Sequence, residues 1–168
     1  MTNSKISTED MEIAVATYFD YRQNLIVPRV SWGMYFNHEC DLLILTKNNY
    51  AYEVEIKISR SDLMVDRKKK HCHYSDKIKK LYFAIPEYLK KHIDLIPEHA
   101  GIIIVSKNEN TSSFAPSLWG KQNEKYYCNV ERKALSKSKY KMTDKERYNL
   151  ARLGSMRIWS LKKRLNKL

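Results

Sequence analysis

Two apolar segments on either side of a short polar turn form the clearest pattern along this chain. Residues 40–46 and 50–58 predict two strands, joined as a hairpin by Lys47-Asn48-Asn49. The first strand is apolar on both faces, as in the central strand of a covered sheet. The second alternates with a period of two, which divides its side chains between two faces. Glu53, Glu55 and Lys57 share one face, and Val54, Ile56 and Ile58 share the other.

The rest of the chain alternates between helical and strand patterns. Helix starts are indicated at Ser7-Thr8-Glu9-Asp10, at residues 59–62 for a helix to about 71, and at the capping box Thr143–Glu146, which opens a long C-terminal helix. Further strands are predicted near 27–33, 81–85 and 101–105, with a short helix over 87–93, a loop over 107–125 and an edge strand over 126–130.

This order of elements predicts a mixed α/β fold, with a sheet of about five strands flanked by helices. Strands separated by helices imply parallel neighbours, whereas the hairpin supplies an antiparallel pair. The 168 residues suit one domain, and 43% hydrophobic residues with only four glycines and four prolines exclude a disordered or low-complexity chain. No secretory signal or segment of membrane-spanning length is visible, so we expect a cytoplasmic protein with no membrane partner.

The hairpin also carries the candidate chemistry. Asp41 opens its first strand and can reach the polar face that holds Glu55 and Lys57. Carboxylates at one point supply oxygen ligands for a hard divalent cation, and a lysine beside the ion steadies a phosphate or a hydroxide. This combination points to phosphodiester chemistry. The alternative is an amphipathic strand with one solvated face. The neighbouring strand argues against this alternative, because it is apolar on both faces, as in a covered sheet.

The net charge of +12 is unevenly distributed. Residues 131–168 hold thirteen Lys and Arg against three acids, and residues 67–80 hold seven against one. The remainder is therefore acidic, and it contains Asp41 and Glu55. An acidic patch between basic flanks is expected of a protein that binds a polyanion backbone and acts on it. The alternative is a basic protein whose charge runs are solvated, since it would have the same composition.

Three cysteines and nearby histidines raise the question of zinc. His71-Cys72-His73 lies downstream of His38 and Cys40. Structural zinc sites usually place paired ligands two to four residues apart, and no second such pair follows. We therefore expect these side chains to be reduced, and either packed in the core or solvated.

In its motif the chain resembles the PD-(D/E)XK nuclease superfamily, whose core runs α-β-β-β-α-β. The superfamily places an acid on the second strand and Asp/Glu-X-Lys on the third, which Asp41 and Glu55-Ile56-Lys57 match. Cys40 replaces the usual proline before the first acid. The resemblance implies a restriction-endonuclease-like fold with a nuclease core over about residues 8–106 and a basic extension over about 131–168.

Within the superfamily the chain most resembles MmcB-like DNA-repair proteins. The similar segments run in order after the proposed catalytic strand: Lys57-Ile-Ser-Arg-Ser-Asp-Leu-Met-Val-Asp-Arg-Lys, Tyr74-Ser-Asp-Lys, Leu81-Tyr-Phe-Ala-Ile-Pro and Ile96-Pro-Glu-His-Ala-Gly-Ile. The resemblance implies a metal-dependent deoxyribonuclease acting in DNA repair, recombination or mobile-element processing. A non-catalytic nucleic-acid-binding module with the same fold is the alternative.

The resemblance also assigns roles to single residues. Asp41, Glu55 and the backbone carbonyl of Ile56 would bind Mg²⁺ or Mn²⁺, and Lys57 would hold the attacking water or offset charge on the phosphate. A second group would support the site: Glu12, Glu53, Asp62 and Tyr74. Asp66, four residues after Asp62, also resembles a family position, and Glu53 is expected to support the site or face the substrate. Ordinary explanations exist for the others, since Glu12 suits the first turn of a helix, Asp62 and Asp66 suit pairing on a helix surface, and Tyr74 suits the core.

Nucleic acid, DNA rather than RNA, is the expected partner, and the basic residues are its expected contacts. They are Arg67, Lys68, Lys69, Lys70, Lys77, Lys79, Lys80, Arg147, Arg152, Lys162, Lys163 and Arg164. The C-terminal helix also carries an apolar stripe with basic flanks, which suits docking on the sheet, DNA contact, a homodimer or a membrane surface; we expect packing together with nucleic-acid contact. An interaction protein that binds an acidic partner through this helix is a further alternative.

Overall fold

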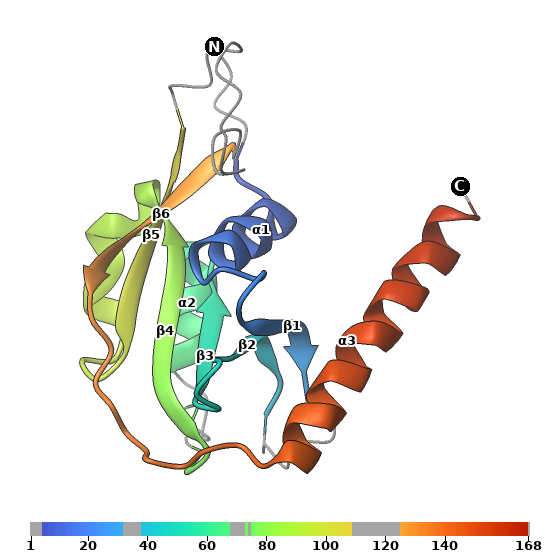
Figure 1. Cartoon of the computed structure of the whole chain (residues 1–168). Coiled ribbons are helices and arrows are strands. Elements are labelled where there is room, and N and C mark those ends of the chain that lie inside the picture. The colour runs from blue at the N-terminus through green and yellow to red at the C-terminus, as the bar shows by residue number, and fades with distance from the viewer. Residues whose placement is uncertain (1–4, 32–37, 68–72, 74, 109–124, 168) are drawn as a thin grey trace.

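The computed structural model describes residues 5–31, 38–67, 73, 75–108 and 125–167. A six-stranded sheet with strand order β1-β2-β3-β4-β5-β6 forms the centre of the molecule (Figure 1). In chain order the elements are α1 (Thr8–Tyr18), β1 (Leu25–Val30), β2 (Cys40–Leu45), β3 (Ala51–Ile56), α2 (Arg60–Arg67), β4 (Ile78–Pro86), the 3-10 helix η1 (Glu87–Leu95), β5 (Gly101–Lys107), β6 (Tyr126–Arg132) and α3 (Asp144–Leu165).

The mixed sheet confirms the predicted α/β architecture. Neighbouring strands are antiparallel at both ends of the sheet, and β3, β4 and β5 are parallel. A short loop joins β2 to β3, and Asn49 takes the left-handed conformation (φ 63°) that closes such a hairpin. Ser7 caps α1, and the capping box between Thr143 and Glu146 is present at the start of α3.

Two element boundaries differ from the prediction for identifiable reasons. β1 covers Leu25–Val30 and includes Pro28, which an edge strand tolerates because its outer N–H groups have no ladder partner. β4 begins at Ile78, ahead of the predicted start at Leu81, because Lys79 and Lys80 lie on the strand with their ammonium groups over tyrosine rings. The end of the helix predicted over 59–71 lies outside the described residues.

One face of the sheet is covered by α1. Met11, Ala14 and Val15 of this helix pack against alternate residues of the central strands, among them Val54 and Ile56. The apolar side of the predicted β3 pattern therefore faces a continuous core.

The opposite face is divided between two apolar clusters. Leu150 and Leu153 of α3 pack on β1, β2 and the start of β3, whereas α2 and η1 cover β4 and β5 (Figure 1). Glu53 lies between these clusters, because it is opposite Leu43 of the first on one side and Leu81 of the second on the other. Polar residues occupy the place where the two clusters meet.

The buried apolar residues of helix α3, Leu150 and Leu153, lie in its first half, and Arg157 further along donates to the Arg29 carbonyl of β1. Residues 133–143 pass along the ends of the strands, where Lys137 N–H donates to the Lys79 carbonyl and Met142 N–H donates to the Asn49 carbonyl. Beyond Gly154 the helix is exposed and projects away from the sheet (Figure 1). None of the described helices is long and apolar enough to span a bilayer.

Candidate active site

The site begins where β2 and β3 stop pairing. The antiparallel register runs from Leu45 opposite Ala51 to Leu42 opposite Val54. Beyond this point the Ile56 N–H donates to Asp41 Oδ2 at 2.8 Å, so a side-chain oxygen replaces a backbone carbonyl as the acceptor. This bond fixes the Asp41 carboxylate at the edge of β3. The Asp41 side chain remains 38% exposed.

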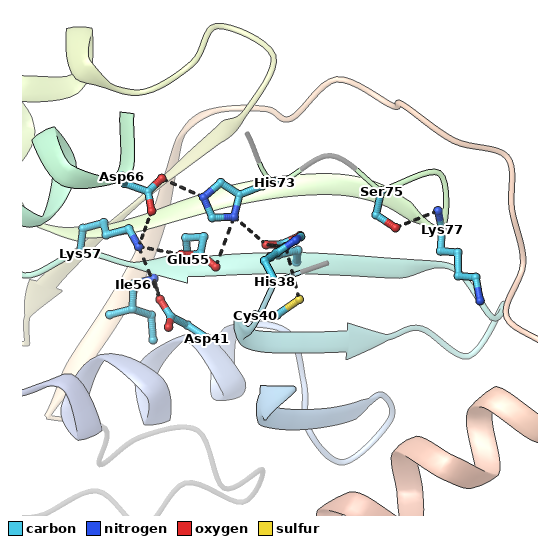
Figure 2. A network of polar contacts seen from close by, with 11 residues as sticks. His38, Cys40, Asp41, Glu55, Ile56, Lys57, Asp66, His73, Ser75 and Lys77 are labelled. Atoms are coloured by element: carbon cyan, nitrogen blue, oxygen red, sulfur yellow. Dashed lines mark hydrogen bonds and ion pairs between the residues drawn. The ribbon is translucent and has the colours of Figure 1, made fainter. Parts of the chain in front are cut away.

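Three carboxylates converge on the ammonium group of Lys57 (Figure 2). Lys57 Nζ lies 2.6 Å from Glu55 Oε2, 3.0 Å from Asp66 Oδ1 and 3.8 Å from Asp41 Oδ2. Glu55 is on β3 and Lys57 directly follows that strand, whereas Asp41 comes from β2 and Asp66 from the last turn of α2. The cluster therefore joins two strands and a helix around one positive charge.

Burial and charge set the protonation of this cluster. Burial alone would lower the pKa of Lys57, but Glu55, Asp41 and Asp66 raise it, so the amine stays protonated. Burial and the negative charge of Asp41 raise the pKa of Glu55, which Lys57 partly opposes. A lysine in this state donates hydrogen bonds and offsets negative charge, and it has no lone pair with which to act as a base.

A second polar group surrounds Glu53. Glu53 Oε1 lies 2.7 Å from His38 Nε2 and 3.0 Å from His73 Nδ1. The other ring nitrogen of His73 is 2.9 Å from Asp66 Oδ2. Asp66 therefore contacts both groups, with one oxygen on Lys57 and the other on His73 (Figure 2).

The histidines keep Glu53 ionised inside the protein. Burial alone would raise the pKa of Glu53, but hydrogen bonds from His38 and His73 lower it. Burial would likewise lower the pKa of His73, but Asp66 and the glutamates raise it to about 9. Glu53 and Glu55 of one central strand, 0% and 1% exposed, are costly to desolvate unless they are paired. So concentrated a set of buried charges is more typical of a functional site than of a structural core.

The acids around Lys57 suit a hard divalent cation. Mg²⁺ takes oxygen ligands, keeps several waters and needs only one or two protein carboxylates. Asp41 Oδ2 accepts from the Ile56 N–H, which leaves Oδ1 for solvent or an ion, and the Ile56 carbonyl belongs to the same end of β3. The predicted ligand set of Asp41, Glu55 and the Ile56 carbonyl therefore fits such an ion.

Comparison with known proteins identifies the family. A family model described as DNA repair protein MmcB-like matches residues 5–155. The chain belongs to the MmcB-like family. MmcB-like proteins lie within the restriction-endonuclease-like superfamily, which confirms the resemblance seen in the sequence.

A solved structure resembles this MmcB-like chain across its length. It is the SPO1766 protein of unknown function from Silicibacter pomeroyi, with 15% identity, a TM-score of 0.59, and coverage of 99% of this chain and 94% of that one. At this identity the likeness shows the fold alone. No curated protein matches the chain significantly.

The MmcB-like fold brings the three motif residues Asp41, Glu55 and Lys57 together as the motif requires. Glu12 is half-buried on α1, where burial and the charges of Glu9 and Asp41 raise the pKa of its carboxyl against the opposing effect of Arg29. Asp62 is exposed in the first turn of α2. One turn later, Asp66, the second aspartate of this helix that resembles a family position, contacts Lys57 and His73.

Two further expectations concern Tyr74 and the group of histidines with Cys40. Tyr74 lies outside the described residues. His38, His73 and Cys40, expected to be packed in the core or solvated, are gathered near Glu53. Burial and the charges of Glu53 and Glu55 raise the pKa of Cys40, so its thiol is protonated. The sequence signal for this group is the pair of His-X-Cys and His-Cys-His spacings, but only the fold brings them together.

The predicted DNA-binding residues fall into three sets. Lys68, Lys69 and Lys70 lie outside the described residues, and Arg67 ends α2. Lys77, Lys79, Lys80 and Arg147 have intramolecular partners in Glu146, Tyr50, Tyr52 and Asn49. Arg152, Lys162, Lys163 and Arg164 are exposed on α3. The exposed end of α3 therefore carries a basic surface that is accessible to a polyanion.

Proposed function

We propose that this MmcB-like protein is a Mg²⁺- or Mn²⁺-dependent nuclease that hydrolyses DNA phosphodiester bonds during DNA repair. The observation that carries the proposal is the convergence of Asp41, Glu55 and Asp66 on Lys57 at the diverging ends of β2 and β3. The membership in a DNA-repair family with a nuclease-like fold supports it.

In this proposal each residue has a separate task. Asp41 and Glu55, with the Ile56 carbonyl, hold the cation, which when bound polarises the scissile phosphate and lowers the pKa of a water. Lys57, kept as an ammonium, donates to phosphate oxygens and offsets the charge that develops on them. Asp66 positions Lys57 from α2.

The exposure of the site favours an approach of the DNA backbone from the Asp41 side. Glu55 and Lys57 are 1% and 7% exposed, whereas Asp41 is on the surface of the cluster. A phosphate therefore reaches Lys57 by coming alongside Asp41, at the place where the cation would neutralise both carboxylates. This arrangement favours a metal requirement, because without a cation the two acids repel the phosphate.

A binding module without catalysis is the second candidate. One observation favours it: the Lys57 ammonium already pairs with three carboxylates, so part of their charge is balanced without an ion. A protein that keeps the nuclease fold, binds DNA through α3 and cleaves nothing would be consistent with carboxylates whose charge Lys57 already balances in part.

Incubation with end-labelled duplex, single-stranded and branched DNA in Mg²⁺ or Mn²⁺ separates the two candidates. The nuclease predicts cleavage of at least one substrate, and abolition of that cleavage in Glu55→Gln, which keeps the side-chain shape. Binding of DNA without cleavage of any substrate in Mn²⁺ would instead support the binding module.

A further inference from the structure

Four side chains with metal-ligand chemistry meet beside the proposed nuclease centre. His38 Nε2 lies 2.7 Å from Glu53 Oε1 and 3.9 Å from Cys40 Sγ, and His73 Nδ1 lies 3.0 Å from the same glutamate oxygen. His38, Cys40 and His73 are labelled in Figure 2. They come from the segment before β2, from β2 and β3, and from the segment after α2. The ligand atoms of His38, Cys40 and Glu53 all lie within 4.8 Å of one another, and those of His73, Glu53 and Glu55 form a second such group that shares Glu53.

These separations suit one tetrahedral ion. Zinc binds His nitrogen and carboxylate oxygen at about 2.0–2.2 Å and cysteine sulfur at about 2.3 Å, so neighbouring ligand atoms stand about 3.4 Å apart. Three of the six ligand pairs, His38–Glu53, His73–Glu53 and His38–Cys40, have separations of 2.7, 3.0 and 3.9 Å, which bracket this value. Small shifts at each side chain would open the cluster around an ion.

The burial and hydrogen bonding of Glu53 give independent support for a ligand at this cluster. Glu53 is fully buried, yet its Oε2 has no hydrogen-bond partner among the described residues. Buried carboxylate oxygens are rarely left without a partner, and a bound ion or water is the usual explanation. Glu53 Oε1 already has two histidine neighbours, so an ion between the four side chains would also give the carboxylate its missing contact.

The surroundings of His73 match those of a metal-bound histidine. Its Nδ1 faces the cluster, while Nε2 contacts Asp66 Oδ2 at 2.9 Å. A ligating imidazole almost always has its second nitrogen held by a carboxylate, a carbonyl or a water, which fixes the ring orientation. Asp66 supplies that support and contacts Lys57 with its other oxygen.

The ligand chemistry distinguishes this cluster from the acids around Lys57. Two imidazoles, a thiol and one carboxylate favour a borderline ion such as Zn²⁺, whereas Asp41 and Glu55 offer only the oxygens that Mg²⁺ prefers. We propose that His38, Cys40, Glu53 and His73 bind one Zn²⁺-class ion, separate from the Mg²⁺ or Mn²⁺ of the proposed nuclease centre. The ion would fasten the segments before β2 and after α2 to β3.

Cobalt titration of the metal-stripped full-length protein tests this site. With excess Mg²⁺ present to occupy the carboxylates around Lys57, one Co²⁺ per chain should bind with the intense visible bands of a tetrahedral ion and a thiolate-to-cobalt charge-transfer band. Zn²⁺ should displace it. Cys40→Ser should abolish the charge-transfer band, while the matched variant Cys128→Ser, which changes a cysteine on β6, should keep it.

Further variants separate this site from the nuclease proposal and from a folding defect. Lys57→Ala should keep the cobalt spectrum, whereas Asp66→Asn should weaken Co²⁺ binding by about 10–100-fold. Zn²⁺ should raise the melting temperature of the wild type and of Cys128→Ser, but much less that of Cys40→Ser. The proposal is overturned by a weak octahedral-type spectrum, or by a charge-transfer band that survives in Cys40→Ser.

Discussion

Asp66 Oδ1 lies 3.0 Å from Lys57 Nζ, which ties the last turn of α2 to the end of β3. Asp66 is buried, whereas Asp62, one turn earlier on the same helix, is exposed. The two aspartates therefore form a matched pair, in which Asp66 alone contacts the lysine of the motif.

Asp66→Asn should lower the free energy of unfolding by about 3 kcal/mol and reduce DNA cleavage, because it removes a buried counter-charge from both Lys57 and His73. Asp62→Asn should change stability by less than about 0.5 kcal/mol, as expected of a surface substitution. Urea unfolding and cleavage assays on both variants provide the measurement. Equal effects of the two substitutions would contradict the positioning role of Asp66.

Lys57→Ala should abolish cleavage but leave DNA affinity within about twofold, since it removes one charge among many and a buried one. Fluorescence anisotropy with labelled DNA measures affinity, and gel assays measure cleavage. Circular dichroism checks that the variant is folded. Cleavage by folded Lys57→Ala at the wild-type rate would exclude Lys57 from the chemistry.

The exposed end of α3 should determine the salt dependence of DNA binding. Replacing Lys162, Lys163 and Arg164 by Gln should weaken binding to duplex DNA. The slope of log affinity against log salt should fall by roughly 0.9 for each phosphate that the variant no longer neutralises. Lys90→Gln is the control, because its ammonium is 2.9 Å from Glu131 Oε2 and is already paired, away from α3. An unchanged slope in the triple variant would assign the helix to a protein partner or a second copy of the chain.

Glu146 should make the attachment of α3 sensitive to acid. Burial alone would raise the pKa of Glu146, but Lys77 and Thr143 lower it to about 2, from an ordinary value of 4.5. Because folding lowers this pKa, the ionised carboxylate of Glu146 stabilises the folded protein above about pH 4.5. This stabilisation decreases as the pH falls toward 2.

Glu146→Gln should therefore destabilise the protein by about 2 kcal/mol at pH 7, and the gap to the wild type should narrow below about pH 4.5. Urea unfolding of both proteins at neutral pH and at two acidic pH values below the ordinary glutamate pKa measures this gap. A gap that is constant across this range would mean that the ionised carboxylate is not what holds α3.

The fold can be predicted from the sequence because most elements follow local rules. The period of two in β3, the polar turn after Leu45 and the capping box at Thr143 each depend on residues close together in the chain. The start of β4 escapes prediction because Lys79 and Lys80 resemble a solvated charge run, and only the tyrosines of the hairpin show how they are accommodated.

The site can be predicted only in part. Asp41, Glu55 and Lys57 follow from a strand pattern and a motif. The resemblance implies only a supporting role for Glu53, yet Glu53 is fully buried. Its partners His38 and His73 lie far apart in the chain and meet only because β3 runs between their segments. No rule based on sequence spacing predicts that Glu53 contacts these two histidines.

The metal dependence of DNA cleavage tests the central claim most directly. Asp41 and Glu55 offer Mg²⁺ a sparse oxygen set, whereas Ca²⁺ takes about six to eight ligands at longer distances and would bind without placing the attacking water well. Cleavage of labelled DNA should be compared in chelator, Mg²⁺, Mn²⁺, and Mg²⁺ with added Ca²⁺. We expect no cleavage in chelator, cleavage in Mg²⁺ or Mn²⁺, and inhibition by Ca²⁺. Full activity in chelator would contradict the account.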